Sequence, residues 1–549
     1  MFDFTQHVST RLRRLVTPQS EAIPNSTQGP NSAGGYAWPV DNWKRLDRFL
    51  LFGSERGTYY IRERTLTREN AGAVARCIAE DGARVVRRVI EISESGRAPS
   101  NDPSLFVLAM AAGLGDTDTR RAALTALPRV ARTGTHLFHW LQFVKAFRGW
   151  GRGVRTAVGG WYAAKPANDL ACQLLKYPAR DGWSHRDALR LAHPKAPTYE
   201  HEMLFRYIVR GWDGITGTAA LRTDIGGRLE SVQALREMSP AEAARVIRIY
   251  GLTREMVPTE MLSHAAVWEA LLDRMPLTAL IRNLGVMGKV GLLAPGSDAA
   301  RRIVIRLGDR DAVRRARVHP LAVLAALKTY QQGHGVRGRG RWTPVPQVVD
   351  ALDRAFYLAF ENAPSTGKRI MLALDVSGSM GAPVGAMPYL SCREASAAMA
   401  LVTAATEPNH RFVAFTNGNY PSLHSRYGYN SGLSPLSISP RQRLDDIVRA
   451  TAAMPFGGTD CALPMTEALR HRWAVDVFVI YTDNETWAGE IHPAQALRDY
   501  RERMGIAAKL VVVAMASNGF TIADPDDAGM LDVVGFDAAA PSVITDFVS

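Results

Sequence analysis

Three oxygen-bearing side chains stand at alternate positions after the apolar run 370–374: Asp375, Ser377 and Ser379. An uninterrupted apolar run of this length is typical of a buried strand in a parallel sheet. Open α/β sheets bind ligands beyond the carboxyl ends of their strands, and one carboxylate with two hydroxyls suits a hard cation such as Mg²⁺. Asp and Ser are also common helix N-caps, so these residues alone leave a metal site and a simple cap as alternatives.

Two later loops extend this set. Thr459 lies in the loop Gly457-Gly458-Thr459-Asp460, and Asp483 follows the expected strand 475–481. An Asp-x-Ser-x-Ser motif, a Thr in a Gly-Gly loop and an Asp after a later strand resemble the metal-ion-dependent adhesion site of von Willebrand factor A domains. The resemblance implies that these five residues bind a divalent cation, expected to be Mg²⁺, directly or through water, and that a partner's carboxylate completes the coordination.

Strands and helices alternate around these loops, which predicts a doubly wound α/β domain over residues 367–549. The expected strands are 370–375, 411–415, 475–481 and 509–515, and the expected helices are 389–406, 441–453, 462–470, 493–504 and 541–548. The chain has no Gly-x-Ser-x-Gly elbow, no His-Glu-x-x-His motif and no phosphate loop with the required spacing. Nothing in these motifs requires an enzyme.

The preceding part of the chain is helical almost throughout. Alanine-rich segments with 3.6-residue apolar spacing run from about Leu66 to Gln332, separated by short Gly, Pro or Asp breaks. So many helices joined by short loops favour a HEAT-like α-solenoid over a single bundle. We therefore predict a mobile, Pro-, Gly- and Ser-rich tail over residues 1–35, a helical domain over 36–366 and the α/β domain over 367–549.

Composition is consistent with a cytoplasmic protein of at least two domains. A chain of 549 residues exceeds the length at which single cores usually stop growing. Its four cysteines form no Cys-x-x-Cys pair, which argues against a disulfide framework and a structural zinc site. We find neither an apolar run of membrane-spanning length nor the apolar stretch of a signal peptide.

Charge is divided unequally between the two parts. Residues 1–366 carry 52 Lys and Arg against 34 Asp and Glu, whereas residues 367–549 carry 14 against 19. A basic excess concentrated in one domain favours a polyanionic partner, most often nucleic acid. The alternative is a solvated basic surface without a partner.

The stretch 145–168 is the strongest nucleic-acid candidate. It combines cations with the aromatics Phe147, Trp150, Trp161 and Tyr162 and contains no acidic residue. Cations neutralise phosphates and aromatic faces stack on unpaired bases, although the same aromatics could instead be core. A polar loop at 176–187 follows. The candidate RNA-binding residues from both segments are Lys145, Arg148, Arg152, Arg155, Lys176, Arg180, His185 and Arg186.

Several long motif strings resemble the Ro autoantigen family, whose members carry a TROVE module. The matching strings are Leu46–Tyr60, Trp150–Tyr162, Gly182–His193, Glu269–Gly285, His319–Gly338, Gly367–Ser379, Gly457–Met465 and Asp476–Trp487. With Ser517–Asp527 and Phe536-Asp537, the resemblance covers about residues 36–548. The tail and residues 416–440 depart from the family pattern, so no family function is carried over to them.

This resemblance implies a ring of HEAT-like repeats closed by the von Willebrand factor A domain. Family members bind Y RNA on the basic outer surface and 3′ single-stranded ends of misfolded RNA through the ring. Bacterial relatives work with an exoribonuclease such as polynucleotide phosphorylase in structured-RNA decay and ribosomal RNA maturation. The family's Trp-Ser-His motif falls on Trp183-Ser184-His185, which implies an RNA contact at His185. A ring formed by one chain implies a monomer.

Three hypotheses follow. The leading one is a non-catalytic RNA-binding scaffold. The second is a metal-dependent protein-interaction module of the adhesion type, in which RNA binding is incidental. The third is an RNA-processing enzyme that uses the metal at Asp375.

Overall fold

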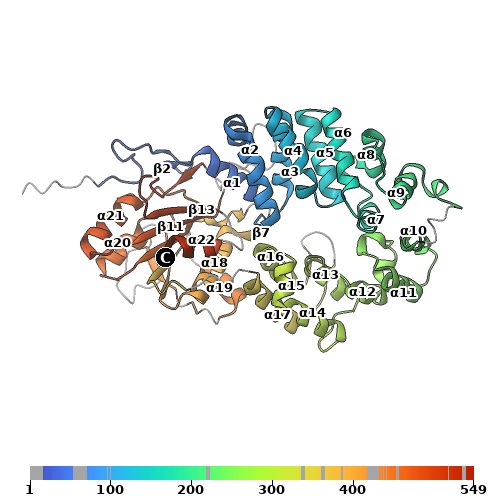
Figure 1. Cartoon of the computed structure of the whole chain (residues 1–549). Helices are drawn as coiled ribbons and strands as arrows, with labels where there is room; N and C mark the ends of the chain where they lie inside the picture. The colour runs from blue at the N-terminus through green and yellow to red at the C-terminus, as the bar shows by residue number, and fades with distance from the viewer. Residues whose placement is uncertain are drawn as a thin grey trace, which may run out of the picture.

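Helices build the first part of the chain and a parallel sheet builds the last part (Figure 1). This computed structural model describes residues 16–52, 71–95, 97–98, 100–217, 223–335, 340–359, 365–384, 387–416, 432–436, 438–439, 442–452, 457–516, 519–534 and 540–548. Residues 57–61, whose sequence is compatible with a short hairpin or turn, and most of the loop 416–440 lie outside the described residues.

The helices form two rows, which we call the upper and lower arms. Both arms extend from the α/β domain and approach each other at the opposite end of the molecule (Figure 1). The upper arm consists of α1 (Asn42–Phe52), α2 (Gly72–Ser95), α3 (Asp102–Leu114), α4 (Thr117–Val130), α5 (Gly134–Phe147), α6 (Arg152–Ala163), α7 (Ala167–Lys176), α8 (His185–Ala192), α9 (Tyr199–Arg210) and α10 (Asp224–Ala234). The lower arm consists of α11 (Pro240–Tyr250), α12 (Ala265–Leu272), α13 (Leu277–Lys289), α14 (Asp298–Gly308), α15 (Arg310–Arg315), α16 (Pro320–Gln331) and α17 (Pro346–Leu358).

Local sequence explains where these helices begin and bend. The apolar spacing predicts separate helices over 71–80 and 83–93, and the structure joins them in α2, which is interrupted at Asp81, where φ is −151° and ψ is 83°. Helix α3 is apolar on all sides, and its residues 103–112 are all buried, as expected for a helix at the centre of its arm. Asp116, Thr133 and Ser297 accept hydrogen bonds from backbone N–H groups in the first turns of α4, α5 and α14.

Two hydrophobic cores support the arms. The upper arm has its own core, drawn from residues between Leu46 and Leu229. The core of the lower arm runs from Leu235 through Phe356 and continues into one face of the sheet. The lower arm is therefore joined to the α/β domain by continuous apolar packing.

The sheet has six strands in the order β13-β11-β10-β5-β8-β9, all parallel except the edge strand β9. These strands are β5 (Ile370–Asp375), β8 (His410–Phe415), β9 (Leu433–Pro435), β10 (Val477–Thr482), β11 (Lys509–Ala514) and β13 (Met530–Val534). Every residue of β5 and β10 is buried, which explains why both are continuous apolar runs. The chain proceeds from β5 toward β9 and then returns to β10, so the switch point lies between β5 and β10.

Helices cover both faces of the sheet. Apolar residues of α18 (Cys392–Thr406), α19 (Leu444–Ala452) and α22 (Ala540–Val548) pack on one face. Those of α20 (Leu463–Arg470) and α21 (Pro493–Met504) pack on the other. Helix α18 begins later than predicted, because residues 387–391 form strand β7, which pairs with β6 (Pro383–Val384). Strand β13 was not predicted.

The N-terminal segment is more ordered than the sequence predicted. Residues 16–35 were predicted to be mobile, but they pack on the α/β domain, and Gln19 is fully buried. Strands β1 (Gly29–Pro30) and β2 (Tyr36–Pro39) form a small antiparallel sheet with β12 (Phe520–Thr521). The Pro-, Gly- and Ser-rich composition gave no sign of this, because the segment is held by contacts to residues more than 400 positions away.

The ends of the two arms also contact each other directly. The Arg317 guanidinium donates to the backbone carbonyl of Glu94, and His319 Nε2 lies 2.8 Å from the carbonyl oxygen of Arg97. The predicted closure by the α/β domain is therefore accompanied by contacts within the helical region itself.

Candidate metal centre and nucleic-acid interface

All five predicted metal ligands lie at the carboxyl edge of the sheet, beside the switch point. Asp375 ends β5, Ser377 and Ser379 occupy the following turn, Thr459 lies in the loop before α20, and Asp483 follows β10. Each side chain is at most 3% exposed. The three loops that carry these residues thus meet at one edge of the sheet, as the resemblance implied, and the backbone carbonyl of Thr459 accepts from Trp487 and Ala488 in the loop after Asp483.

Hydrogen bonds order the ligand set around Asp375. Asp375 Oδ1 accepts from the backbone N–H of Ser377 at 2.8 Å, and Asp375 Oδ2 accepts from Thr482 Oγ1 at 2.7 Å. The hydroxyls of Ser377 and Ser379 are 3.0 Å apart. The Arg393 guanidinium, from α18, donates to the carbonyls of Val376 and Ser377 at 2.8 and 3.1 Å. Sequence reasoning missed Arg393, because no motif marks it.

The electrostatics fit a cation. Burial raises the pKa of Asp375, and burial together with the negative charges of Asp375 and Glu485 raises the pKa of Asp483. Two neighbouring buried carboxylates must be protonated or neutralised by a positive charge. Carboxylates and hydroxyls are hard oxygen donors, which suit Mg²⁺. Within the described part of the chain there is no group of three or more His, Cys, Asp or Glu that could hold a metal, and the mixed set of two carboxylates and three hydroxyls stays a candidate.

The predicted cationic stretch is partly surface and partly core. Lys145, Arg148, Arg152 and Arg155 are exposed at the end of α5 and on α6. Trp161 and Tyr162, by contrast, are completely buried. The hypothesis that these two aromatics stack on bases is therefore wrong, because they form the core beneath the cations.

A second pair of aromatic rings lies at the surface. Trp150 and Trp183 are half-buried and stack with their ring centroids 6.2 Å apart. This stack joins the start of α6 to the hairpin of β3 (Ala179–Arg180) and β4 (Trp183–Ser184). Since α6 also packs on α8, the exposed Arg152, Arg180 and Arg186 are presented by neighbouring elements. Lys176 is half-buried, with its amino group 3.7 Å from a carboxylate oxygen of Glu255.

His185 does not reach the surface in this structure. Its side chain is 1% exposed, and Nδ1 lies 2.7 Å from the Tyr162 hydroxyl. The Phe138 ring packs on it with a centroid distance of 4.7 Å. Burial lowers the pKa of His185 to about 4, so the imidazole is neutral at pH 7. As it lies here the side chain is covered by its neighbours, and its contact with RNA stays a prediction. His185 instead fixes the start of α8, which Ser184 and Asp187 cap reciprocally.

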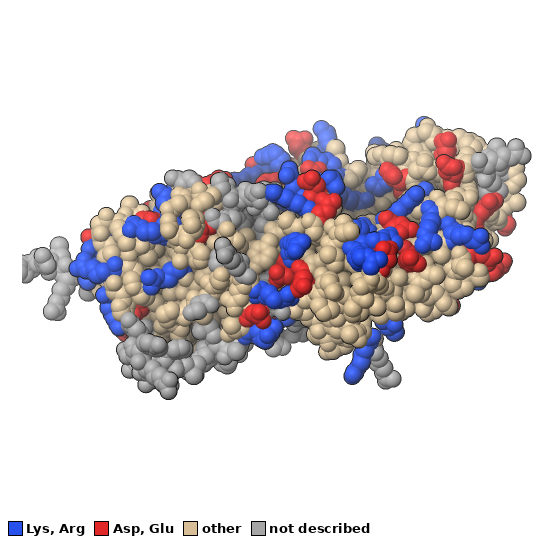
Figure 2. All heavy atoms as spheres, turned by 90° about the horizontal axis from the view of Figure 1, so that it is seen from below, with Lys and Arg blue, Asp and Glu red and all other residues tan. Residues whose placement is uncertain are grey.

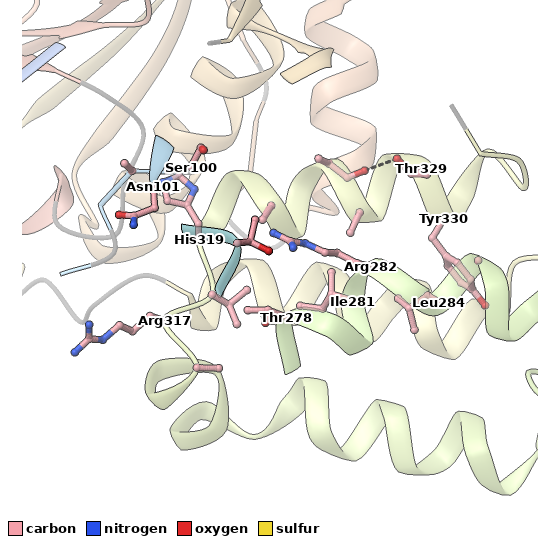
Figure 3. A pocket seen from close by; sticks show the side chains of 18 of the residues that line it. Ser100, Asn101, Thr278, Ile281, Arg282, Leu284, Arg317, His319, Thr329 and Tyr330 are labelled. Carbon is pink, nitrogen blue, oxygen red and sulfur yellow. Dashed lines mark hydrogen bonds between the residues drawn. The ribbon is translucent and has the colours of Figure 1, made fainter. Parts of the chain in front are cut away.

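A cavity that sequence reasoning did not locate lies between the two arms. Its volume is about 1160 Å³, and its walls come from α3, α5, α13 and α16 and from Trp342. Figure 3 shows labelled side chains from both arms around it, including Asn101 from the upper arm and Arg282 from the lower. The charged and titratable lining residues are Arg132, Arg282, Lys289, Arg317, His136, His139, His319 and one carboxylate, Asp102.

The ratio of cations to carboxylates in the cavity differs from the ratio on the outer face of the lower arm. Figure 2, a view from below, shows Lys and Arg over the helical half with Asp and Glu beside many of them. Asp273, for example, pairs with Arg248 at 2.9 Å and also with Arg302. Cations paired in this way are already neutralised, whereas those of the cavity outnumber its one carboxylate. The cavity was not found from the sequence because its cations are scattered over residues 132–317.

A helical region followed by an α/β domain with a mostly parallel sheet defines the class of protein. Residues 29–220 and 249–330 match the TROVE domain, and residues 369–548 match the Ro60 vWA domain. The chain belongs to the Ro60 family of TROVE proteins. The predicted family and fold class are thereby confirmed.

Relatives match the chain over nearly its full length. "RNA-binding protein RO60" of Deinococcus radiodurans is 43% identical over 536 residues, which is 97% of each chain. "RNA-binding protein RO60" of Caenorhabditis elegans is 36% identical and covers 99% of this chain and 93% of that protein. The crystal structure of the Deinococcus radiodurans RO (RSR) protein has a TM-score of 0.69 at 42% identity, covering 92% of this chain and 99% of that one. No described helix is long and apolar enough to cross a membrane.

Proposed function

We propose that this protein is a non-catalytic RNA-binding scaffold with two RNA sites. The outer site consists of Arg152, Arg155, Arg180 and Arg186 around the Trp150–Trp183 stack. The inner site is the cavity between the arms. The observation that carries the proposal is the excess of cations over carboxylates in that cavity. The names of two relatives, both RNA-binding proteins, support it.

The two sites suit different parts of one RNA. Exposed arginines on an outer surface can contact the phosphates of a structured RNA such as a Y RNA. The cavity exceeds the roughly 300–1,000 Å³ of typical small-molecule pockets, and it is lined by cations together with Tyr330 and Trp342. Such a lining suits a few unpaired nucleotides at the 3′ end of a misfolded RNA. In this proposal, an outer RNA also recruits an exoribonuclease such as polynucleotide phosphorylase, for RNA decay and ribosomal RNA maturation.

Binding measurements with two RNAs test the two sites separately. One RNA is a blunt hairpin, and the other carries a single-stranded 3′ tail. We expect Arg152→Ala/Arg155→Ala to weaken binding of both and to reduce the salt slope by ~1 for each phosphate that is no longer neutralised. We expect Arg282→Ala/Lys289→Ala to remove only the extra affinity that the tail gives. Arg503→Ala, an exposed arginine on α21, is the matched control. Equal affinity in all variants would contradict the proposal.

Nuclease association is tested by co-purification from cells. Polynucleotide phosphorylase should accompany the wild-type protein, and ribonuclease treatment should release it. Persistence after ribonuclease treatment would show a direct protein contact instead.

The alternative is a metal-dependent protein-interaction module, and the buried ligand set around Asp375 favours it as a second activity. When bound, the cation would be held by Asp375, Ser377, Ser379, Thr459 and Asp483 and would offer a coordination position to a partner's carboxylate. Asp375→Ala should abolish association with that partner and leave RNA affinity unchanged. RNA cleavage by the purified protein with Mg²⁺, abolished in the same variant, would instead support the enzyme hypothesis.

A further inference from the structure

The segment 16–39, which we call the N-terminal strap, lies on the loops that carry two of the candidate metal ligands. Its central anchor is Gln19, whose side chain is fully buried. The Gln19 backbone N–H donates to the carbonyl of Gly489 at 2.8 Å, and its carbonyl accepts from the N–H of Tyr36 at 2.8 Å. These two bonds attach the backbone of Gln19 to the α/β domain and to strand β2.

The Gln19 amide connects the two loops. Nε2 donates to Asp460 Oδ1 at 2.7 Å and to the carbonyl of Ile491 at 2.8 Å, and Oε1 accepts from the Thr486 hydroxyl. Asp460 directly follows the candidate ligand Thr459, and Thr486 lies three residues after Asp483. One buried side chain from the N-terminal region therefore bridges the Thr459 loop and the Asp483 loop.

Thr486 completes this bridge. Its hydroxyl oxygen accepts from the backbone N–H of Cys461 at 3.2 Å and lies 3.4 Å from the carbonyl oxygen of Thr459. The spacing of the two loops thus depends on the hydroxyl that Gln19 also contacts. Residues that hold metal ligands in place in this way normally affect metal affinity without touching the metal.

The rest of the strap contacts the same loop. Asn31 Nδ2 donates to the carbonyl of Thr486 at 2.7 Å, and the N–H of Ala33 donates to Glu485 Oε2 at 3.1 Å. Gly35 lies so close that a Cβ atom added there would be 2.0 Å from the carbonyl oxygen of Thr486. Any side chain at position 35 would therefore push the strap off the loop.

We propose that Gln19 is a positioning residue for the cation site and that docking of the N-terminal strap and binding of the cation are thermodynamically linked. The proposal rests on the metal site proposed above. Ligands from separate loops bind one ion only when the loops keep a fixed distance, and Gln19 sets that distance. Linkage is reciprocal: if the docked strap strengthens cation binding by some factor, the cation strengthens strap docking by the same factor.

The test measures Mn²⁺ binding to the full chain by electron paramagnetic resonance and calorimetry. We expect Gln19→Ala to weaken Mn²⁺ binding at least tenfold. Gly35→Ala keeps Gln19 but displaces the strap, and we expect a similar reduction. The matched control is Gln28→Ala, because Gln28 lies on the strap and contacts Ile23 and His492, the residue before α21, rather than Asp460 or Thr486. Its affinity should stay within about threefold of wild type.

Limited proteolysis supplies the reciprocal readout. Mn²⁺ should slow cleavage within residues 16–39 of the wild-type protein at least fivefold and should have no such effect on Asp375→Ala. If the wild-type protein binds no Mn²⁺, the metal site itself is wrong and the linkage falls with it. If wild type, Gln19→Ala and Gly35→Ala bind Mn²⁺ equally, the metal site stands and the positioning role of Gln19 is overturned.

Discussion

Burial makes His185 a structural residue beneath the proposed outer RNA site. The Tyr162 hydroxyl lies 2.7 Å from Nδ1 of the neutral imidazole, and Phe138 packs on the ring. Its neighbour Arg186 is exposed, and in our proposal it contacts a phosphate of the RNA. Replacing His185 and replacing Arg186 should therefore have different effects on stability and on RNA affinity.

We expect His185→Ala to lower both stability and RNA affinity. The substitution leaves a cavity and a buried hydroxyl without its partner, which together should cost about 2–4 kcal/mol. Arg186→Ala should lower RNA affinity and leave the melting temperature unchanged. Thermal unfolding and binding of a blunt hairpin RNA, measured on both variants, check this. If His185→Ala melts like the wild type but no longer binds the hairpin, the imidazole contacts RNA directly.

Two buried histidines should make the upper arm sensitive to acid. Burial lowers the pKa of His185 to about 4, and burial with the nearby charge of Arg132 lowers that of His136 to about 4, from an ordinary value of 6.5. The unfolded chain therefore takes up these protons first as the pH falls. Stability is full above pH 6.5 and declines toward pH 4, by at most roughly 3 kcal/mol per histidine.

Melting temperatures between pH 7 and pH 4 check this prediction. The decline should be smaller in His136→Gln, which removes one of the two groups, than in the wild type. An identical decline in both proteins would assign the acid sensitivity to other groups.

At the scale of elements, His139 links the cavity to the β3–β4 hairpin. Its Nδ1 lies 2.8 Å from Asp102 Oδ1, and its Nε2 lies 3.3 Å from Asp181 Oδ2 in the turn of the hairpin. Carboxylates only accept hydrogen bonds, so both contacts require the doubly protonated imidazolium. The hydrogen bond with Asp102 raises the pKa of His139, although burial and Arg180 oppose the shift. His136 and Arg132 are the other titratable and charged groups nearby.

The imidazolium bridge of His139 should break in alkaline solution. Because the folded pKa lies above the ordinary value of 6.5, its stabilisation is full below pH 6.5 and disappears as the pH rises through the raised pKa. The difference in melting temperature between wild type and His139→Ala should therefore be larger at pH 6 than at pH 9. Asp181→Asn should show part of the same pH dependence, and the exposed His264→Ala should show none. A constant difference for His139→Ala would argue against the imidazolium bridge.

Elements governed by local pattern were predictable from the sequence, and those held by distant contacts were not. Strand 370–375 and helix 493–504 were predicted with the boundaries found, because burial and capping mark them locally. The five proposed metal ligands could be named from the sequence because they follow strand ends or lie in a Gly-Gly loop, and their binding of a cation stays a prediction. The docking of Gln19 depends on partners 441 and 467 positions away, and no local pattern reports it. Likewise, spacing alone does not show that Trp161 is core while Trp150 is at the surface.

At the scale of the whole molecule, the two arms and the α/β domain form a ring. The stability of this ring depends on how each arm is joined to the α/β domain. The upper arm is joined by Arg48 of α1, whose guanidinium donates to Asp532 Oδ2 of β13 at 2.8 Å and to the carbonyl of Phe520 at 2.9 Å. Both charged side chains are fully buried. The lower arm is joined by apolar packing and by ion pairs nearer the surface, such as Arg443 with Asp350.

The buried pair should therefore be the sensitive point of the ring. Arg48→Met leaves Asp532 as an unpaired buried charge, which should destabilise the protein by about 3–5 kcal/mol. Asp350→Asn breaks a pair whose side chains are 40% and 57% exposed, and it should cost about 1 kcal/mol or less. Urea unfolding, followed by circular dichroism, compares the two variants.

A double variant separates charge from packing at this junction. In Arg48→Met/Asp532→Leu no unpaired charge remains, so most of the stability missing in Arg48→Met should be recovered. Small-angle scattering on the same proteins reports the shape: an opened ring in Arg48→Met should have a larger radius of gyration, and the double variant should return toward wild type. If Arg48→Met unfolds and scatters like the wild type, the apolar packing of the lower arm and the contacts of Arg317 and His319 are sufficient to keep the ring closed.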